Sequence, residues 1–153
     1  MLDLSETRCR ALQSNAFAYF HNLEELRLEN CSFMNISSDS LSGLSHLKRL
    51  FLRGTGLRTL EILDGIATNG SLEEIDLGNN RISSLNNLLR ALSRFRLKAI
   101  AIDGNPVCRT AYAEPLIEDH LQSLCVLNGA PVSEEIRSAI IQRIEEEEKE
   151  RAE

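Results

Sequence analysis

Leucine and isoleucine recur along this chain in a pattern that repeats about every 25 residues. Each copy contains a short stretch in which every second residue is apolar, as in a strand with one buried face. Four copies begin at Leu23, Leu47, Leu72 and Leu97, with spacings of 24, 25 and 25 residues, and a partial copy aligns Leu2 with Leu26. The pattern predicts five parallel strands at residues 2–4, 25–28, 49–52, 74–77 and 99–102.

The segments that return from one strand to the next change along the chain. SNAFAYFHN and SDSLSGLSH are rich in small polar residues and predict irregular or short helical turns, whereas LEILDGIATNG and LNNLLRALSRF space their apolar residues every three or four and predict helices. Stacked strand and return units curve, because strands and helices differ in width. The expected fold is therefore α/β: a curved right-handed solenoid with a concave parallel sheet and a helical or irregular convex side.

The copies LEELRLENCSF, LKRLFLRGTGL, LEEIDLGNNRI and LKAIAIDGNPV fit the motif L-x-x-L-x-L-x-x-N-x-L and resemble the leucine-rich repeat family. A polar side chain at the Asn position can bond the backbone of the neighbouring turn, which would otherwise be buried without partners. Thr does this in part and Cys weakly, so the first three turns are expected to be softer than the last two. The Asn position carries Thr7, Cys31, Thr55, Asn80 and Asn105.

The segment after the last repeat resembles the C-terminal cap of an intracellular subset of leucine-rich repeat proteins. That subset includes a spliceosomal subunit, a phosphatase regulator and ciliary and centrosomal scaffolds. The departures are Gln122 where the cap usually has Pro, Asn128 for Asp, and one extra residue before Leu121. The matching residues are Asn105, Pro106, Tyr112, Leu121, Leu124, Leu127, Gly129, Val132, Glu134, Glu135 and Arg137.

Three regions are expected: repeats at 1–106, of which the first is incomplete, a cap at 107–132, and a terminal helix with an acidic tail at 133–153. Ser133 is a suitable N-cap for that helix. Ile136, Ile140 and Ile144 should dock on the cap, and the Glu-rich run beyond them should be solvated.

The front of the chain lacks a comparable cap, because Met1 begins inside a repeat. Leu2 and Leu4 would then form an edge strand beside an uncovered apolar layer. We expect the chain to be cut from a longer protein, or else this edge to be covered by another chain, including a second copy of itself.

The net charge of −6 lies mainly at the C-terminus, since residues 145–153 hold six Glu against Lys149 and Arg151. The rest of the chain is only slightly negative, which argues against a surface that follows nucleic acid phosphates. The N-terminus has no basic and apolar leader, and no stretch reaches the roughly 18 apolar residues of a membrane span. We therefore expect a cytoplasmic location, in a cytoskeletal or ciliary assembly by the resemblance, although a nuclear one also fits.

The sequence favours neither metal binding nor catalysis. Its cysteines form no CxxC pair and have no His at metal spacing, so they are expected to be reduced and mostly buried. None of the three His residues has a nucleophile placed by a known motif, and GxSxG, Gly-rich phosphate loops and HExxH are absent from the sequence. We expect no enzyme activity and no cofactor. The cysteines are Cys9, Cys31, Cys108 and Cys125.

The outward side chains of the strands form the candidate binding surface, because adjacent strands present them as a grid. Phe51 with Arg27, Arg49 and Arg53 is the expected centre, since aromatics and Arg dominate interface energetics. The alternative is a Phe half covered by Arg stems within a solvated charged surface. The columns of the grid are Glu25, Arg49, Glu74 and Ala99; Asp3, Arg27, Phe51, Asp76 and Ala101; and Ser5, Glu29, Arg53, Gly78 and Asp103.

These observations predict a protein interaction scaffold whose partner is a protein, bound through Arg27, Glu29, Arg49, Phe51, Arg53 and Asp76. The alternative is a secreted or cell-surface recognition ectodomain. The sequons at Asn30, Asn35 and Asn69 favour the alternative. Extracellular caps typically carry a cluster of cysteines after the Asn-Pro pair. In this sequence only Cys108 closely follows Asn105 and Pro106, which disfavours the alternative.

Overall fold

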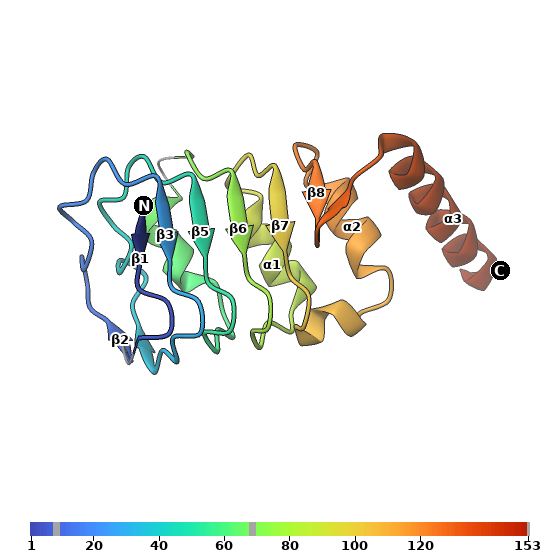
Figure 1. Cartoon of the computed structure of the whole chain (residues 1–153). Coiled ribbons are helices and arrows are strands. Elements are labelled where there is room, and N and C mark those ends of the chain that lie inside the picture. Colours follow the sequence, from blue (N-terminus) through green and yellow to red (C-terminus); the bar gives the residue numbers. More distant parts are fainter. Residues whose placement is uncertain (8–9, 68–69, 153) are drawn as a thin grey trace.

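The chain forms a single curved stack of repeats closed at its C-terminal end by a helical cap (Figure 1). The structure is a computed structural model, and it describes residues 1–7, 10–67 and 70–152, without the side chains of residues 35 and 136. A seven-stranded sheet runs in the order β1-β3-β5-β6-β7-β8-β9. Its strands are β1 (Leu2–Asp3), β3 (Glu25–Arg27), β5 (Arg49–Phe51), β6 (Glu74–Asp76), β7 (Ala99–Ala101), β8 (Val126–Leu127) and β9 (Ala130–Pro131).

The parallel sheet of the repeats is confirmed. Each of the five predicted strands is found within one or two residues of its predicted end, and equivalent residues pair across the sheet, for example Leu26 with Leu50. The expectation of five strands was too low, because the cap contributes β8, which pairs in parallel with β7. β9 then pairs antiparallel with β8 and ends the sheet.

The return segments differ as their apolar spacing dictates. The first two are turns, joined by a small parallel sheet of β2 (Ala11–Leu12) and β4 (Asn35–Ile36) that the sequence pattern did not indicate. The third was predicted as a helix and is the 3₁₀-helix η1 (Glu61–Ile66). Its buried residues are Ile62, Leu63 and Ile66, of which Leu63 and Ile66 have the three-residue spacing that a 3₁₀-helix places on one face.

The fourth return segment is α1 (Leu85–Leu92), which is a true α-helix. Leu88 and Leu92, four residues apart, are its buried residues. The helix begins after Ser84, whose side chain accepts a hydrogen bond from the backbone N–H of Asn87. Between the returns and the sheet lies one continuous core built almost entirely from Leu and Ile.

Asn80 and Asn105 tie the turns together as the motif predicts. The buried Asn80 amide oxygen accepts hydrogen bonds from the N–H groups of Thr55 and Leu57, and its nitrogen donates to three carbonyls. Earlier in the chain, Thr55 donates to the carbonyl of Leu52 over 2.8 Å, while the Cys31 thiol reaches the carbonyl of Leu4 at 3.2 Å. That the first three turns are softer therefore stays a prediction.

The cap consists of the 3₁₀-helix η2 (Pro106–Arg109), α2 (Ala113–His120), β8 and β9, and α3 (Glu134–Ala152) packs against α2. The buried Arg137 reaches from α3 into the cap, where its guanidinium donates to the carbonyl of Leu124 and to Gln122. Ile144 is buried and Ile140 half-buried as expected, whereas the Ile136 side chain lies outside the described part. The acidic run is helical up to Ala152.

The expectation of mostly buried cysteines was wrong for two of the three described. Cys31 is buried in the repeat core, but Cys108, in η2, and Cys125, just before β8, are exposed. Cys9 lies outside the described residues, as does the sequon residue Asn69.

At the N-terminal edge, Leu2 and Leu4 are half-buried against the core while Met1 is exposed. No helix in the described residues is both long and apolar enough to cross a membrane.

Candidate functional site

The concave face of the sheet presents the predicted grid of side chains. Strand register aligns Glu25 with Arg49 and Glu74, and it aligns Arg27 with Phe51 and Asp76. Because alternate residues point to opposite faces, Leu26, Leu50 and Ile75 lie in the core while these neighbours face out. The structure therefore brings together the six residues expected to bind a partner, all on or beside β3, β5 and β6.

Phe51 lies beneath an arginine. The guanidinium carbon of Arg27 is 4.1 Å from the centre of the Phe51 ring, a cation–π contact, and Phe51 is half-buried. Glu25 and Glu29 hold Arg27 in this place through ion pairs of 3.6 and 3.3 Å. The ring is therefore fixed within a charged frame, as the alternative interpretation of Phe51 supposed.

Glu25 joins the two arginines of neighbouring strands. Besides its pair with Arg27, it accepts a hydrogen bond of 3.0 Å from Nε of Arg49, and its own side chain is only 14% exposed. The Arg49 side chain is 45% exposed, and among the described residues Nε is the Arg49 atom that donates a hydrogen bond to an acid. Arg49 therefore keeps its two terminal nitrogens available to a partner.

Arg53, in contrast, donates a hydrogen bond from each of its three side-chain nitrogens to acids of the same chain. Its Nε donates to Asp76 at 3.0 Å, and its two terminal nitrogens form a bidentate pair with Asp103 at 2.9 and 2.7 Å. The hydrogen bonds to Asp103 and then to Asp76 raise the pKa of Arg53 above its ordinary value. The same bonds from Arg53 lower the pKa of Asp103.

Gly78 makes this long pair possible. In the register it lies between Arg53 and Asp103, and a Cβ atom added to it would be 2.3 Å from the guanidinium carbon of Arg53. Arg53 therefore crosses the sheet directly over the glycine backbone to reach a residue two repeats away. Asp76 supports the turn as well, because it accepts a hydrogen bond from the N–H of Gly78.

Sequence reasoning placed the three arginines beside Phe51 but did not pair them. The residues it left out of the site are Glu25, Gly78 and Asp103. The sequence did contain a signal for Gly78 and Asp103. In their column of the grid, Gly78 lies between Arg53 and Asp103 and carries no side chain that would keep the two apart.

The site carries charge and one aromatic ring but no arrangement for metal binding. Within the described residues, no group of three or more His, Cys, Asp or Glu side chains is placed to hold a metal ion. Next to the charged residues of β6, strand β7 presents the small side chains of Ala99 and Ala101, so the sheet surface is lower beyond Asp76. A partner can approach the sheet closely there.

Two solved structures share the fold. The chain aligns with "Crystal structure of Drosophila melanogaster SNF/U2A' complex" at 20% identity and a TM-score of 0.54, covering 92% of this chain and 65% of that one. It aligns with "Structure of Chaetomium Mex67:Mtr2 subunits" at 21% identity and a TM-score of 0.52, covering 61% and 60%. The chain thus spans less than two thirds of the length of each of these two chains.

Two sequence models of one family match the chain. One, described as "Leucine rich repeat", covers residues 1–57, and another, "Leucine Rich Repeat", covers residues 71–92, so that together they match just over half of the chain. Domains of this kind serve in general as scaffolds for protein interactions, through the extended surface of the repeat sheet. With its solenoid fold and its repeated motif, this chain belongs to the leucine-rich repeat family.

Proposed function

We propose that this chain is an adaptor that binds a protein partner on its concave face, at a site centred on Phe51. The observation that carries the proposal is the ion-paired frame around that ring: Arg27 stacks on it at 4.1 Å and is itself held by two glutamates. A fixed aromatic and arginine pair loses little conformational entropy on binding, which is the property of an interface hot spot.

The chemistry of the partner follows from which donors are free. Each nitrogen of Arg53 already donates to Asp76 or Asp103, so a carboxylate or phosphorylated side chain of the partner is better received by the terminal nitrogens of Arg49. An apolar partner group would pack against Phe51. Glu29 and Asp76 flank the centre, so an additional negative group on the partner is repelled and the register of binding is restricted.

The test begins with affinity purification of proteins that bind the wild-type chain. A purified partner is then titrated against wild type, Phe51→Ala, Arg49→Glu and Arg53→Glu, with circular dichroism to check folding. Phe51→Ala should weaken binding by about 2 kcal/mol or more, roughly thirtyfold. Tyr19→Ala is the matched control, because that aromatic is 93% exposed in a return segment away from the site. Unchanged affinity in all three concave variants would refute the site.

We also place the protein in the cytoplasm, in a cytoskeletal or ciliary assembly. The assembly rests on the cap resemblance, and the compartment is supported by the exposed thiols of Cys108 and Cys125, which are free. Protein purified without reductant should react at both thiols with a thiol-specific dye. Quantitative disulfide formation instead would favour the extracellular alternative.

A further inference from the structure

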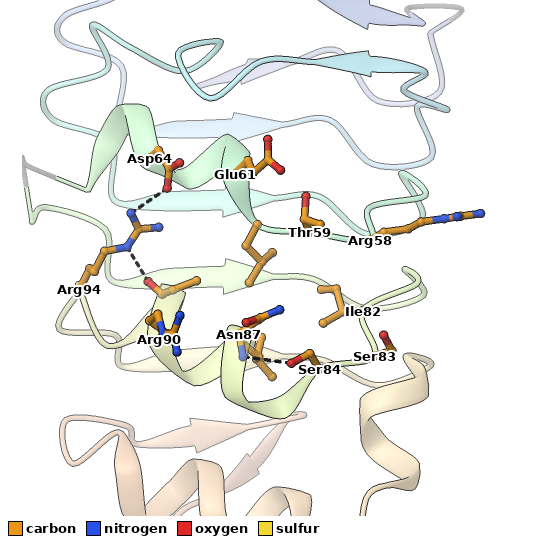
Figure 2. Close-up of a pocket in the computed structure, with 13 residues that line it drawn as sticks. Arg58, Thr59, Glu61, Asp64, Ile82, Ser83, Ser84, Asn87, Arg90 and Arg94 are labelled. Carbon is orange, nitrogen blue, oxygen red and sulfur yellow. Dashed lines mark hydrogen bonds and ion pairs between the residues drawn. The ribbon is translucent and has the colours of Figure 1, made fainter.

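A groove of about 650 Å³ lies between η1 and α1, on the convex side and away from the concave site (Figure 2). Its floor is apolar: Leu60, Ile82 and Leu88 line it, and Ala91 of α1 forms part of its wall. The groove lies where the 3₁₀-helix η1 and the α-helix α1 of successive repeats both contribute to its lining.

Three arginines and two acidic residues, Glu61 and Asp64, line this groove, so its lining carries one net positive charge. Figure 2 shows Arg94 at one end, where it donates to Asp64 at 2.8 Å and to the carbonyl of Ala91 at 3.1 Å. Arg58 lies at the other end and extends outward, and Arg90 lies on α1. Arg58 and Arg90 are both exposed, and neither forms an ion pair within the described residues. This differs from the concave face, where each arginine has an acidic partner.

Arg90 belongs to a wider basic segment of the sequence. From Leu77 to Ile102 the sequence has five basic residues and no acidic one, in a chain whose net charge is −6. Only Arg94 and Lys98 of the five form ion pairs in the described structure, with acids of the preceding turn. The basic residues of the segment are Arg81, Arg90, Arg94, Arg96 and Lys98.

We propose that the groove between η1 and α1 binds an acidic segment of a partner protein that also carries one or two apolar side chains. The apolar side chains would fill the space over Leu60, Ile82 and Leu88, and the acidic groups would pair with Arg58 and Arg90. The proposal is independent of the concave site, because the two surfaces share no residue.

Other occupants fit the groove less well. The acidic run of a second copy, residues 145–150, offers charge but no apolar side chain, and the nearest one, Ile144, is buried in the cap. A nucleic acid would use the arginines but would leave the aliphatic floor unfilled, since single strands are bound by aromatic stacking platforms that this groove lacks.

The proposal is tested by selecting random 12-residue peptides on the wild-type chain after depletion on the double variant Arg58→Glu with Arg90→Glu. Both positions are exposed, so the variant should fold, as circular dichroism would verify. Selected peptides should combine excess Asp and Glu with apolar residues. By fluorescence anisotropy they should bind wild type at least tenfold more tightly than the double variant, with an affinity that falls as salt rises.

A second double variant, Arg10→Glu with Arg109→Glu, is the matched control. It has the same net charge change at exposed positions outside the groove, and it should bind the peptides like wild type. Equal losses in both double variants, neutral or basic selected peptides, or no groove-dependent peptide at all would overturn the proposal. It would also be overturned if an oligouridine RNA bound more tightly than the peptides, or if sedimentation showed a dimer that Arg58→Glu with Arg90→Glu abolishes.

Discussion

Asn80 offers the sharpest test of how the repeats hold together, because one side chain serves two turns. Its amide oxygen accepts from the N–H groups of Thr55 and Leu57 at 3.1 and 3.0 Å, and its nitrogen donates to carbonyls of its own turn and of the preceding one. The side chain is buried, so water cannot replace these bonds after Asn80→Ala without entering the core.

The expected cost follows from counting groups that lose their only partner. Asn80→Ala removes the one acceptor seen in the described structure for the N–H groups of both Thr55 and Leu57. Asn105→Ala removes the acceptor of a single N–H, that of Ile82. At about 1–3 kcal/mol for each buried unpaired group, the losses are about 2–6 and 1–3 kcal/mol. Asn80→Ala should therefore be the more damaging by about 1–3 kcal/mol.

Urea denaturation followed by circular dichroism measures both losses, with equal slopes required before the midpoints are compared. Asn86→Ala is the control, since Asn86 is exposed on α1 and the change should alter the free energy of unfolding by no more than about 0.5 kcal/mol. The reasoning fails if Asn105→Ala costs as much as Asn80→Ala, or if Asn80→Ala costs less than about 1 kcal/mol.

Four further substitutions probe the concave sheet. Leu50→Ala should cost about 2–5 kcal/mol through cavity formation, whereas Phe51→Ala, on the opposite face of β5, should leave the fold intact, as thermal melts would show. Gly78→Ala should displace the Arg53 guanidinium, so that the pKa of Asp103, measured by NMR titration, rises toward its ordinary value; an unchanged pKa would contradict the crossing. Arg53 lowers the pKa of Asp103 in the folded state, so wild type should be more stable than Asp103→Asn above the unfolded pKa of about 3.8. This difference in stability should disappear as the pH falls through the lower folded pKa of Asp103. Urea melts of both proteins across this pH range would measure it.

The strands were predictable because their information is local and repeated. Each strand has two inward apolar residues at a spacing of two, and a one-residue slip would expose them all, so the register Leu26, Leu50, Ile75 and Ile100 follows from the sequence alone. The helical type of a return segment did not follow from spacing, because the buried Ile62 and Ile66 of η1 are four residues apart, as are Leu88 and Leu92 of α1.

The pairing of charges was not predictable by the same means. Arg53 and Asp103 are 50 residues apart, and they meet only because Gly78 leaves the surface between them flat. The position of β8 was also not predictable from the repeat period. Leu127 pairs with Ile100 at a spacing of 27 residues, outside the period of the repeats, so the cap strand does not appear in the periodic pattern.

The two faces differ in how their arginines are neutralised, and this gives them different electrostatic behaviour. On the concave face, Arg27 and Arg53 are held by acids of the same chain, so a partner there gains a new charge pair at Arg49 alone of the three arginines and otherwise depends on packing and shape. On the convex face, Arg58 and Arg90 lack such partners, so an acidic ligand gains charge pairs that salt screens. Steep salt dependence of a partner's affinity therefore indicates the convex groove, and weak salt dependence combined with sensitivity to Phe51→Ala indicates the concave site.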